Sequence, residues 1–423
     1  MKNIKLGDYI EILTDYHSGG SYKTLKENTK ILYKPDYAVM IRTLNFERDD
    51  FKNDLIYCDK QSYNFLKYSH VNENDILMNK IANPGSVYIM PHTNYKCTCG
   101  MNLFLIRFKN INQRYMYYVM KNSEEYIKSK AHGTTTKTIT KDEVRNLEFK
   151  IHDTIDEQNK VERFLTYIDN KIDNNNQINN NLEELMKTLY QRWFIEFEFP
   201  NEDGKPYKSS GGEFIYSEDL KQNIPQKWNV ENCFKNKLYE IIKPGLKNFE
   251  RKNYLATGNV SENMITDGEW ITYENRESRA NMQPIKNSIW FAKMKNSIKH
   301  LTLPEKSEWF INKYILSTGF LGIRCISNSL SYLHCFIYSN YFEKVKDMLA
   351  HGATQESINN EDLKAIKLLI PDNTILERFE NETKSIIQKQ LEIEHENQRL
   401  IELKKFLLPL LMNGQINVDN IEI

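Results

Sequence analysis

Two short segments of this chain combine a histidine, a glycine and a hydroxyl side chain, a set that could serve acid-base chemistry or hold an anion. Ala131-His132-Gly133-Thr134 lies in the first half, and Ala350-His351-Gly352-Ala353-Thr354 lies in the second. Acid-base catalysis by histidine requires a reacting partner within hydrogen-bond reach, and no nucleophile or carboxylate partner is evident for either segment. We therefore predict that each histidine stabilises a turn, with a contact to a phosphate group as the alternative.

His92, Cys97 and Cys99 form a cluster of residue types that bind metals. Their spacing, HxxxxCxC, lacks the second ligand pair that a structural zinc site needs. The six cysteines of the chain are too scattered for a disulfide framework; they are Cys58, Cys97, Cys99, Cys233, Cys325 and Cys335. We predict reduced structural thiols and no bound metal.

The overall charge is balanced, because 57 basic and 57 acidic residues among 423 give a formal net charge of +0. This composition excludes a polycation, so an anionic partner would have to be held by locally clustered charge. With 40% hydrophobic residues the chain can build cores in two to four domains. No stretch approaches the ~20 apolar residues that cross a bilayer, and we expect a cytoplasmic protein.

The two histidine segments are copies of each other. Residues 131–139 and 350–358 share five of nine identities at an offset of 219 residues, which is about half the chain. A shift to an offset of 215 aligns Glu162-Arg163-Phe164 with Glu377-Arg378-Phe379. We predict one large unit used twice rather than a solenoid of short repeats.

Each copy begins as a β-rich globule. Apolar and aromatic runs bounded by Asn, Asp, Gly and Pro predict strands, and they are 37–42, 75–80, 254–259 and 288–293. Helices are predicted over 115–130 and 334–349, followed in each copy by the histidine loop, a short helix and a strand. The globules are therefore predicted to be α+β.

A seven-residue period follows each globule. Val161, Ile168, Asn175, Leu182 and Leu189 lie seven apart, as do Phe379, Ile386, Ile393, Leu400 and Leu407. Heptads of this length predict helices that pair as a coiled coil. Polar residues at Lys171, Asn175, Gln390 and Asn397 interrupt the seams. They indicate either a solvated stretch or buried polar positions that fix the register.

These patterns divide the chain into segments. Pro200 and the glycines at 204, 211 and 212 mark a linker after the first helix. We predict a first globular domain over 1–153, a first helix over 154–199, a linker over 200–222, a second globular domain over 223–371, a second helix over 372–414 and a tail over 415–423. Two similar globules held apart by ~60 Å helices would suit a long, nearly twofold polymer such as duplex DNA.

The whole chain, over residues 1–414, resembles the specificity subunit of Type I restriction-modification enzymes. The segments that carry the resemblance are 75–81 and 83–85, 254–260 and 288–294, both histidine loops, Trp193-Phe194 and 407–411. The resemblance implies two target-recognition domains, related by a pseudo-twofold internal repeat and separated by a long antiparallel two-helix coiled coil. Each domain would read one half of a bipartite DNA target with an unread spacer.

The resemblance also implies partners. They are double-stranded DNA, two methyltransferase (modification) subunits that methylate adenine N6 with S-adenosylmethionine, and restriction/translocase subunits that use ATP and Mg. The chain itself is expected to bind no cofactor and to catalyse nothing. In agreement, its sequence contains no Asn-Pro-Pro-Tyr-like motif and no GxxxxGK[ST] phosphate loop.

Residue types that contact phosphates and base edges in DNA are the candidates for the interface. In the first domain they are Tyr22, Lys23, Arg42, Asn45, Lys80, Thr134, Thr135, Thr136 and Lys137. In the second they are Lys247, Asn248, Asn259, Asn275, Arg276, Arg279, Lys293, Lys295 and Gln355. Arg276 and Arg279 are the foremost candidates for base edges.

Two other functions are considered. A scaffold or decoy of the same fold would bind the methyltransferase subunit without reading DNA. A nuclease would use acids such as Asp203 or Asp372.

Overall fold

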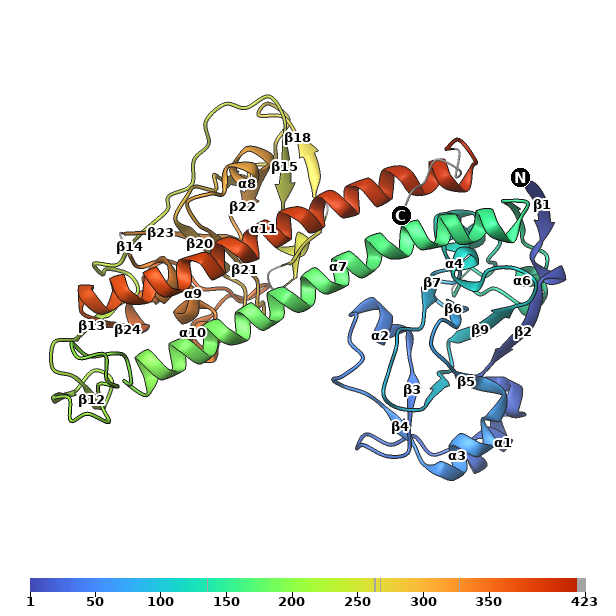
Figure 1. The fold of residues 1–423 in the computed structure, drawn as a ribbon, viewed down its shortest axis with the longest axis horizontal. Coiled ribbons are helices and arrows are strands. Elements are labelled where there is room, and N and C mark those ends of the chain that lie inside the picture. Colours follow the sequence, from blue (N-terminus) through green and yellow to red (C-terminus); the bar gives the residue numbers. More distant parts are fainter. Residues whose placement is uncertain (135, 262–263, 267, 327, 417–423) are drawn as a thin grey trace. The chain divides into compact units, whose positions relative to one another are not determined.

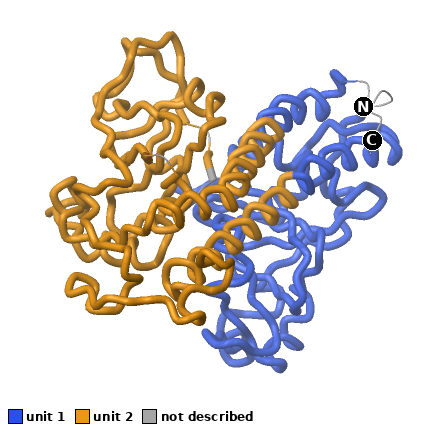
Figure 2. The backbone as a smooth tube through the Cα atoms, turned by 60° about the vertical axis from the view of Figure 1, so that its left-hand side comes forward, with its two compact units in different colours: residues 1–171, 401–423 blue, residues 172–400 orange. Residues whose placement is uncertain are grey.

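The computed structural model describes residues 1–134, 136–261, 264–266, 268–326 and 328–416, so Thr135 and most of the predicted tail lie outside the described residues. The chain divides into two compact units (Figure 2). Unit 1 contains residues 1–171 and 401–423, and unit 2 contains residues 172–400. None of the helices within the described ranges is long and apolar enough to span a bilayer.

Unit 1 contains two four-stranded sheets, with strand orders β2-β9-β6-β7 and β4-β3-β8-β5, and a separate pair β1-β10 (Figure 1). The strands are β1 (Lys2–Lys5), β2 (Ile10–Asp15), β3 (Ala38–Ile41), β4 (Tyr57–Cys58), β5 (His70–Val71), β6 (Ile76–Asn79), β7 (Val87–Ile89), β8 (Cys97–Cys99), β9 (Leu103–Phe108) and β10 (Glu148–Ile151). The helices of the globule are α1 (Tyr22–Asn28), α2 (Thr43–Glu47), α3 (Lys60–Phe65), α4 (Gln113–Asn122), α5 (Glu124–Ser129) and α6 (Lys141–Arg145).

The central strands of unit 1 are buried on both faces, which explains their nearly continuous apolar sequences. On one face, Leu77 and Leu105 share a core with Val39 of the second sheet. On the other face, Ile76 and Ile106 belong to a core built with helical residues. The apolar strands thus hold the loops at their ends in fixed positions.

Unit 2 also contains two four-stranded sheets, with strand orders β14-β23-β20-β21 and β18-β15-β22-β19. The strands are β11 (Phe214–Ser217), β12 (Gln222–Pro225), β13 (Asn229–Asn232), β14 (Tyr239–Ile241), β15 (Lys252–Leu255), β16 (Val260–Ser261), β17 (Met264–Ile265), β18 (Glu269–Ile271), β19 (Ala280–Met282), β20 (Ser288–Ala292), β21 (His300–Leu303), β22 (Tyr314–Ser317), β23 (Phe320–Cys325) and β24 (Lys367–Ile370). The helices of the globule are α8 (Glu308–Lys313), α9 (Leu330–Ile337) and α10 (Asn340–Leu349).

The strand orders of the two units correspond position by position. The β3-β8 pair is parallel, and so is the β15-β22 pair at the same place in unit 2. The outer pair β1-β10 corresponds to β13-β24, and both are antiparallel. Strands β6 and β20 therefore correspond to each other. Lys80, directly after β6, occupies the position in unit 1 that Lys293, directly after β20, occupies in unit 2.

Two long helices contribute to both units: α7 (Ile155–Tyr190) and α11 (Asn373–Met412). Within unit 2, Asn175 Nδ2 donates to Asn397 Oδ1 over 2.8 Å, and Gln390 Nε2 donates to Glu183 over 3.3 Å, so these helical segments run in opposite directions. Within unit 1, Lys404 is paired with Asp169. Asn175 is buried, and α7 is continuous through the Asn-rich stretch.

Three local predictions differ from the structure. The predicted linker over 200–222 contains β11, and Tyr207 stacks on Phe199 with ring centroids 4.6 Å apart. Each helix predicted before a histidine loop is broken into two pieces, at Ser123 between α4 and α5 and at Ser339 before α10, where the Ser339 side chain provides an N-cap. The first long helix ends at Tyr190, before the predicted limit, and continues as one π-helical turn.

Candidate nucleic-acid interface

In unit 1, the end of β6 and the histidine loop are joined by backbone hydrogen bonds. The amide of Ile139 donates to the carbonyl of Lys80 over 3.1 Å, and the amide of Ala82 donates to the carbonyl of Lys137 over 3.0 Å. These bonds place Thr134, Thr136 and Lys137 beside the end of the sheet, with exposed side chains. The loop is therefore a polar edge held by a rigid sheet.

The glycine of each histidine loop is required by its backbone. Gly133 has φ +113°, and a Cβ there would lie 2.4 Å from the Thr136 carbonyl oxygen. Gly352 has φ +137°, and a Cβ there would lie 2.6 Å from the Gln355 carbonyl oxygen. Only glycine fits such a position, which explains why this residue recurs in both copies.

The two histidines make contacts of the kind expected for turn residues. His132 exchanges backbone hydrogen bonds with Thr138, and its Nδ1 lies 2.9 Å from Glu143 Oε1. His351 exchanges backbone hydrogen bonds with Ser357. The Nδ1 atom of His351 lies 3.2 Å from the Leu349 carbonyl oxygen and 3.6 Å from Asp362. Each histidine therefore has a carboxylate nearby, which the sequence alone did not show.

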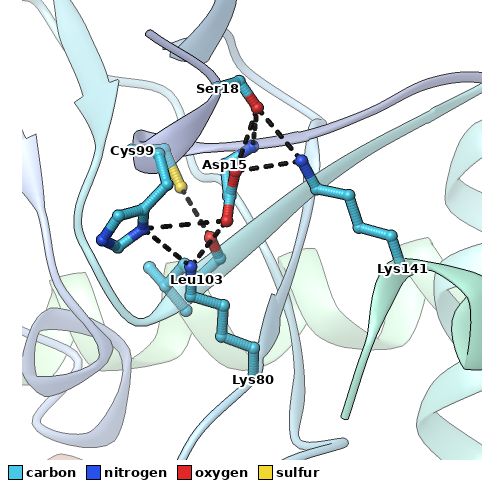
Figure 3. Close-up of polar contacts among 7 residues, drawn as sticks. Asp15, Ser18, Lys80, Cys99, Leu103 and Lys141 are labelled. Atoms are coloured by element: carbon cyan, nitrogen blue, oxygen red, sulfur yellow. Dashed lines mark hydrogen bonds and ion pairs between the residues drawn. The ribbon is translucent and has the colours of Figure 1, made fainter. Parts of the chain in front are cut away.

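Asp15 connects two lysines in unit 1 (Figure 3). Its carboxylate lies 2.6 Å from Lys80 Nζ and 3.0 Å from Lys141 Nζ, and it accepts a hydrogen bond of 2.9 Å from Ser18 Oγ. Burial by itself would raise the pKa of Asp15, but the bonds from Lys80 and Lys141 hold it below its usual value. We call Asp15, Ser18, Lys80 and Lys141 the Asp15 clamp.

Two candidates of the first domain are engaged inside the protein. Lys80 is only 7% exposed and belongs to the Asp15 clamp. Asn45 is 4% exposed, its Oδ1 accepts from the Arg42 amide over 2.9 Å, and its Nδ2 donates to the Asp50 carbonyl over 3.0 Å. Both side chains stabilise the globule. We therefore no longer propose them as DNA contacts.

Other candidates of the first domain are accessible. Tyr22 is 73% exposed, and Lys23 is exposed beside it on α1. Arg42 is partly exposed, and its guanidinium donates to the Asp54 carbonyl. These residues could contact a ligand without disturbing the core.

The same convergence occurs in unit 2. The amide of Ile358, after the second histidine loop, donates to the carbonyl of Lys293 over 3.0 Å. Lys295 Nζ lies 2.8 Å from Glu356, and Gln355 Nε2 lies 3.2 Å from the sulfur of Met294. The loop therefore joins the end of β20, as its counterpart joins the end of β6.

Three further candidates of the second domain make local contacts. Arg276 lies over the Tyr273 ring, 3.9 Å from its centroid, and donates to the Tyr273 carbonyl. Asn275 Oδ1 accepts from the Thr272 amide over 2.7 Å, and Asn259 Oδ1 accepts from the Ala256 amide over 3.0 Å. Arg279, Lys247 and Asn248 are exposed.

Sequence reasoning missed two features, one in each unit. Trp270 is 47% exposed, and the Arg251 guanidinium lies 4.9 Å from the centroid of its ring. The aromatic type of Trp270 was an available signal, whereas its contact with Arg251, which precedes β15, depends on strand pairing. The Asp15 clamp was also missed, because Asp15, Lys80 and Lys141 are far apart in the sequence.

The cysteines are buried thiols. Burial raises the pKa of Cys97 to about 11, and Cys99 is fully buried beside it in β8. His92 is exposed and bonds to Glu73 over 2.9 Å. Within the described ranges, no three His, Cys, Asp or Glu side chains gather in a way that could hold a metal ion.

The sequence of this chain is similar to those of known proteins. Residues 1–184 match the family model described as the Type I restriction modification DNA specificity domain. The Type I restriction enzyme MjaIX specificity subunit of Methanocaldococcus jannaschii is 24% identical over 73% of this chain and 70% of its own length. Residues 1–184 thus resemble a Type I specificity domain, and the chain is similar to specificity subunits of Type I restriction enzymes.

Two further comparisons extend over more of the chain. The Type I restriction enzyme HindI specificity subunit of Haemophilus influenzae is 20% identical over 87% of this chain and 93% of its own length. The crystal structure of a Type I restriction-modification S subunit from M. genitalium aligns with a TM-score of 0.55 and 14% identity, over 97% of this chain and 95% of that one. The fold is therefore similar to that of this S subunit.

Proposed function

We propose that this chain is the DNA-recognition subunit of a Type I restriction-modification enzyme and reads a bipartite target with an unread spacer. The observation that carries this proposal is the occurrence of the same polar edge in both units. In each unit, the histidine loop is bonded to the end of a central strand, at Lys80 in one case and at Lys293 in the other. Two similar polar edges, one in each unit, would allow each unit to contact one half of a bipartite DNA target.

The corresponding strand orders support two target-recognition domains related by an internal repeat. In this proposal, the segments of α7 and α11 form an antiparallel coiled coil that sets the gap between the half-sites. The buried Asn175–Asn397 bond supports this role, since a buried polar pair on a seam favours one register over others.

We propose two methyltransferase subunits and the restriction/translocase subunits as partners. The methyltransferase would use S-adenosylmethionine on adenine N6, and ATP and Mg would serve the translocase, so that no cofactor binds to this chain. Exposed apolar side chains on the long helices are available for contacts with these partners; they are Tyr167, Ile401, Leu403 and Phe406 in unit 1 and Ile178 and Leu185 in unit 2.

In this proposal the chain contributes recognition and the partners contribute catalysis. The alternative is a scaffold or decoy that binds the methyltransferase without reading DNA. Exposed basic side chains at the polar edges, among them Lys137 and Arg279, favour DNA recognition. Such side chains contact DNA phosphates and base edges, whereas a decoy that does not read DNA makes no such contacts.

Adenine-methylation maps of cells with and without the gene test the proposal. We expect a bipartite motif that is methylated only in cells that carry the gene. A decoy would leave the map unchanged while still binding the methyltransferase subunit. A map that contains no motif dependent on the gene contradicts the proposed function.

A further inference from the structure

The position that Asp15 occupies in unit 1 is occupied by a lysine in unit 2. In unit 1, Asp15 pairs with Phe104 of β9, and Phe104 pairs with Met78 of β6. In unit 2, β14 pairs with β23 through Glu240–Arg324 and Ile241–Ile323. The amide of Ile242 then donates to the carbonyl of Gly322. Continued two residues beyond the end of β14 at Ile241, this register would place Lys243 beside Leu321, which pairs with Phe291 of β20.

The second cation of the Asp15 clamp also has no counterpart. In unit 1, Thr140 caps α6 and Lys141 follows it. In unit 2, the amide of Asn359 donates to Asp362 as the amide of Thr140 donates to Glu143, so Asn360 takes the place of Lys141. The carboxylate that neutralises Lys80 is therefore missing around Lys293.

Lys293 lies close to a second cation. The amide of Lys293 donates to the carbonyl of Gly319 over 3.0 Å, and the amide of Thr318 donates to the carbonyl of Arg279 over 2.9 Å. Two adjacent residues of the β22-β23 turn thus bring the backbones of Lys293 and Arg279 together. Burial lowers the pKa of Lys293, and the nearby charge of Arg279 lowers it further.

Neither cation is compensated inside the protein. Among the described residues, neither Lys293 nor Arg279 has an acidic side chain within ion-pair distance, whereas Lys80 has Asp15 at 2.6 Å. Like charges held close together on a fixed backbone are relieved when an anion binds between them. Lys243 is exposed, and the register of β14 and β23, extended by two residues, assigns it the position of Asp15.

We propose that Lys293 and Arg279, assisted by Lys243, form a binding site for one DNA backbone phosphate in unit 2, and that the Asp15 clamp closes the matching site in unit 1. A lysine ammonium binds phosphate as a point charge, and arginine adds a planar set of donors. Arg279 therefore contributes to positioning of the duplex rather than to the reading of bases, in contrast to the role first expected for it. The identity of the anion rests on the proposed function.

Salt dependence of DNA binding distinguishes a phosphate contact from a base contact. Each phosphate contact adds about 0.9 to the slope of log K against log salt concentration. We expect Lys293→Gln and Arg279→Gln in the full-length chain each to reduce this slope by about 1, for cognate and non-cognate duplexes alike. The methylated motif should keep its bases.

Controls separate the charge effect from misfolding. Lys293→Arg keeps the charge and should retain the slope. Lys243→Asp changes an exposed residue and should reduce the slope at least as much as Lys293→Gln, because it restores the carboxylate of unit 1. Lys286→Gln removes an exposed lysine that is paired with Glu305 and Glu308, and it should leave the slope unchanged.

The outcomes separate this inference from the proposed function. An unchanged slope in Lys293→Gln and Lys243→Asp, or changed bases in the methylated motif, would overturn the phosphate site. Equal binding of all duplexes by the wild-type chain with its methyltransferase subunits would contradict the proposed function. The slopes on non-cognate DNA would still test the phosphate site in that case.

Discussion

Units 1 and 2 share one strand order but differ in the charges placed on it. In unit 1, Asp15 forms ion pairs with Lys80 and Lys141, so these two lysines stabilise the fold of the unit. In unit 2, the extended register of β14 assigns Lys243 to that position, and no acidic side chain among the described residues lies within ion-pair distance of Lys293 or Arg279. Two units with corresponding strand orders can thus differ in single residues that decide whether a lysine is paired inside the protein.

Loss of the Asp15 clamp should give the largest effect. Asp15→Asn leaves the ammonium of Lys80 buried without its carboxylate, and an unpaired buried charge costs about 3 to 5 kcal/mol. We expect the free energy of unfolding of unit 1 to fall by about this amount, measured by hydrogen exchange resolved by segment.

The matched control is a surface pair in the same unit. Asp54 is 3.6 Å from Arg48, and its side chain is 82% exposed. Asp54→Asn should therefore change the stability of unit 1 by less than about 1 kcal/mol. Equal effects of Asp15→Asn and Asp54→Asn would show that the clamp contributes no more than a surface ion pair.

The two units should also respond to pH in opposite directions. The lowered pKa of Asp15 stabilises unit 1 above about pH 3.9, the usual value in unfolded chains, and this stabilisation is lost as the pH falls through the folded-state pKa. In unit 2, burial raises the pKa of Glu394 to about 7. Glu394 is therefore protonated in the folded state below that pH, and stability is lost as the pH rises towards 7.

Glu394→Gln should remove this pH dependence from unit 2. We expect the variant to be more stable than the wild type by about 2 kcal/mol at pH 8 and to differ little at pH 4. Gln398 Nε2 donates to Glu394 over 2.9 Å, and a glutamine carbonyl oxygen can accept the same bond. Thermal unfolding of unit 2 at both pH values measures the difference, and a constant difference would refute the assignment to Glu394.

A smaller effect is expected from the polar seam in unit 2. Asn175 Nδ2 donates to Asn397 and to Glu396, each over 2.8 Å. Asn175→Ala removes both bonds and should cost about 1 to 2 kcal/mol in chemical denaturation. Asn174→Ala, at an exposed neighbouring position, should cost less than about 0.5 kcal/mol.

The sequence predicted features whose signals are local. The heptads of α11 gave a helix over 372–414, and the structure places it at Asn373–Met412. The repeated glycine of the histidine loops was visible as a motif, and its φ explains the repetition. The seam position of Asn175 also followed from periodicity, whereas its burial was one of two alternatives that the sequence left open.

Features that depend on distant residues were not predictable in this way. The burial of Lys80 depends on a carboxylate 65 positions away, and the residue type alone suggested a DNA contact. The order of the region after Phe199 depends on aromatic packing with Tyr207 and Trp228, whereas its glycines and proline suggested a linker.

The central claim, that each unit reads one half of the target, is tested by methylation maps of two loop variants. One carries Thr136→Ala with Lys137→Ala in the loop of unit 1, and the other carries Gln355→Ala in the loop of unit 2. We predict altered bases in one half-site for the first variant, in the other half-site for the second, and an unchanged gap in both. Loss or change of both half-sites together in each variant would contradict the account.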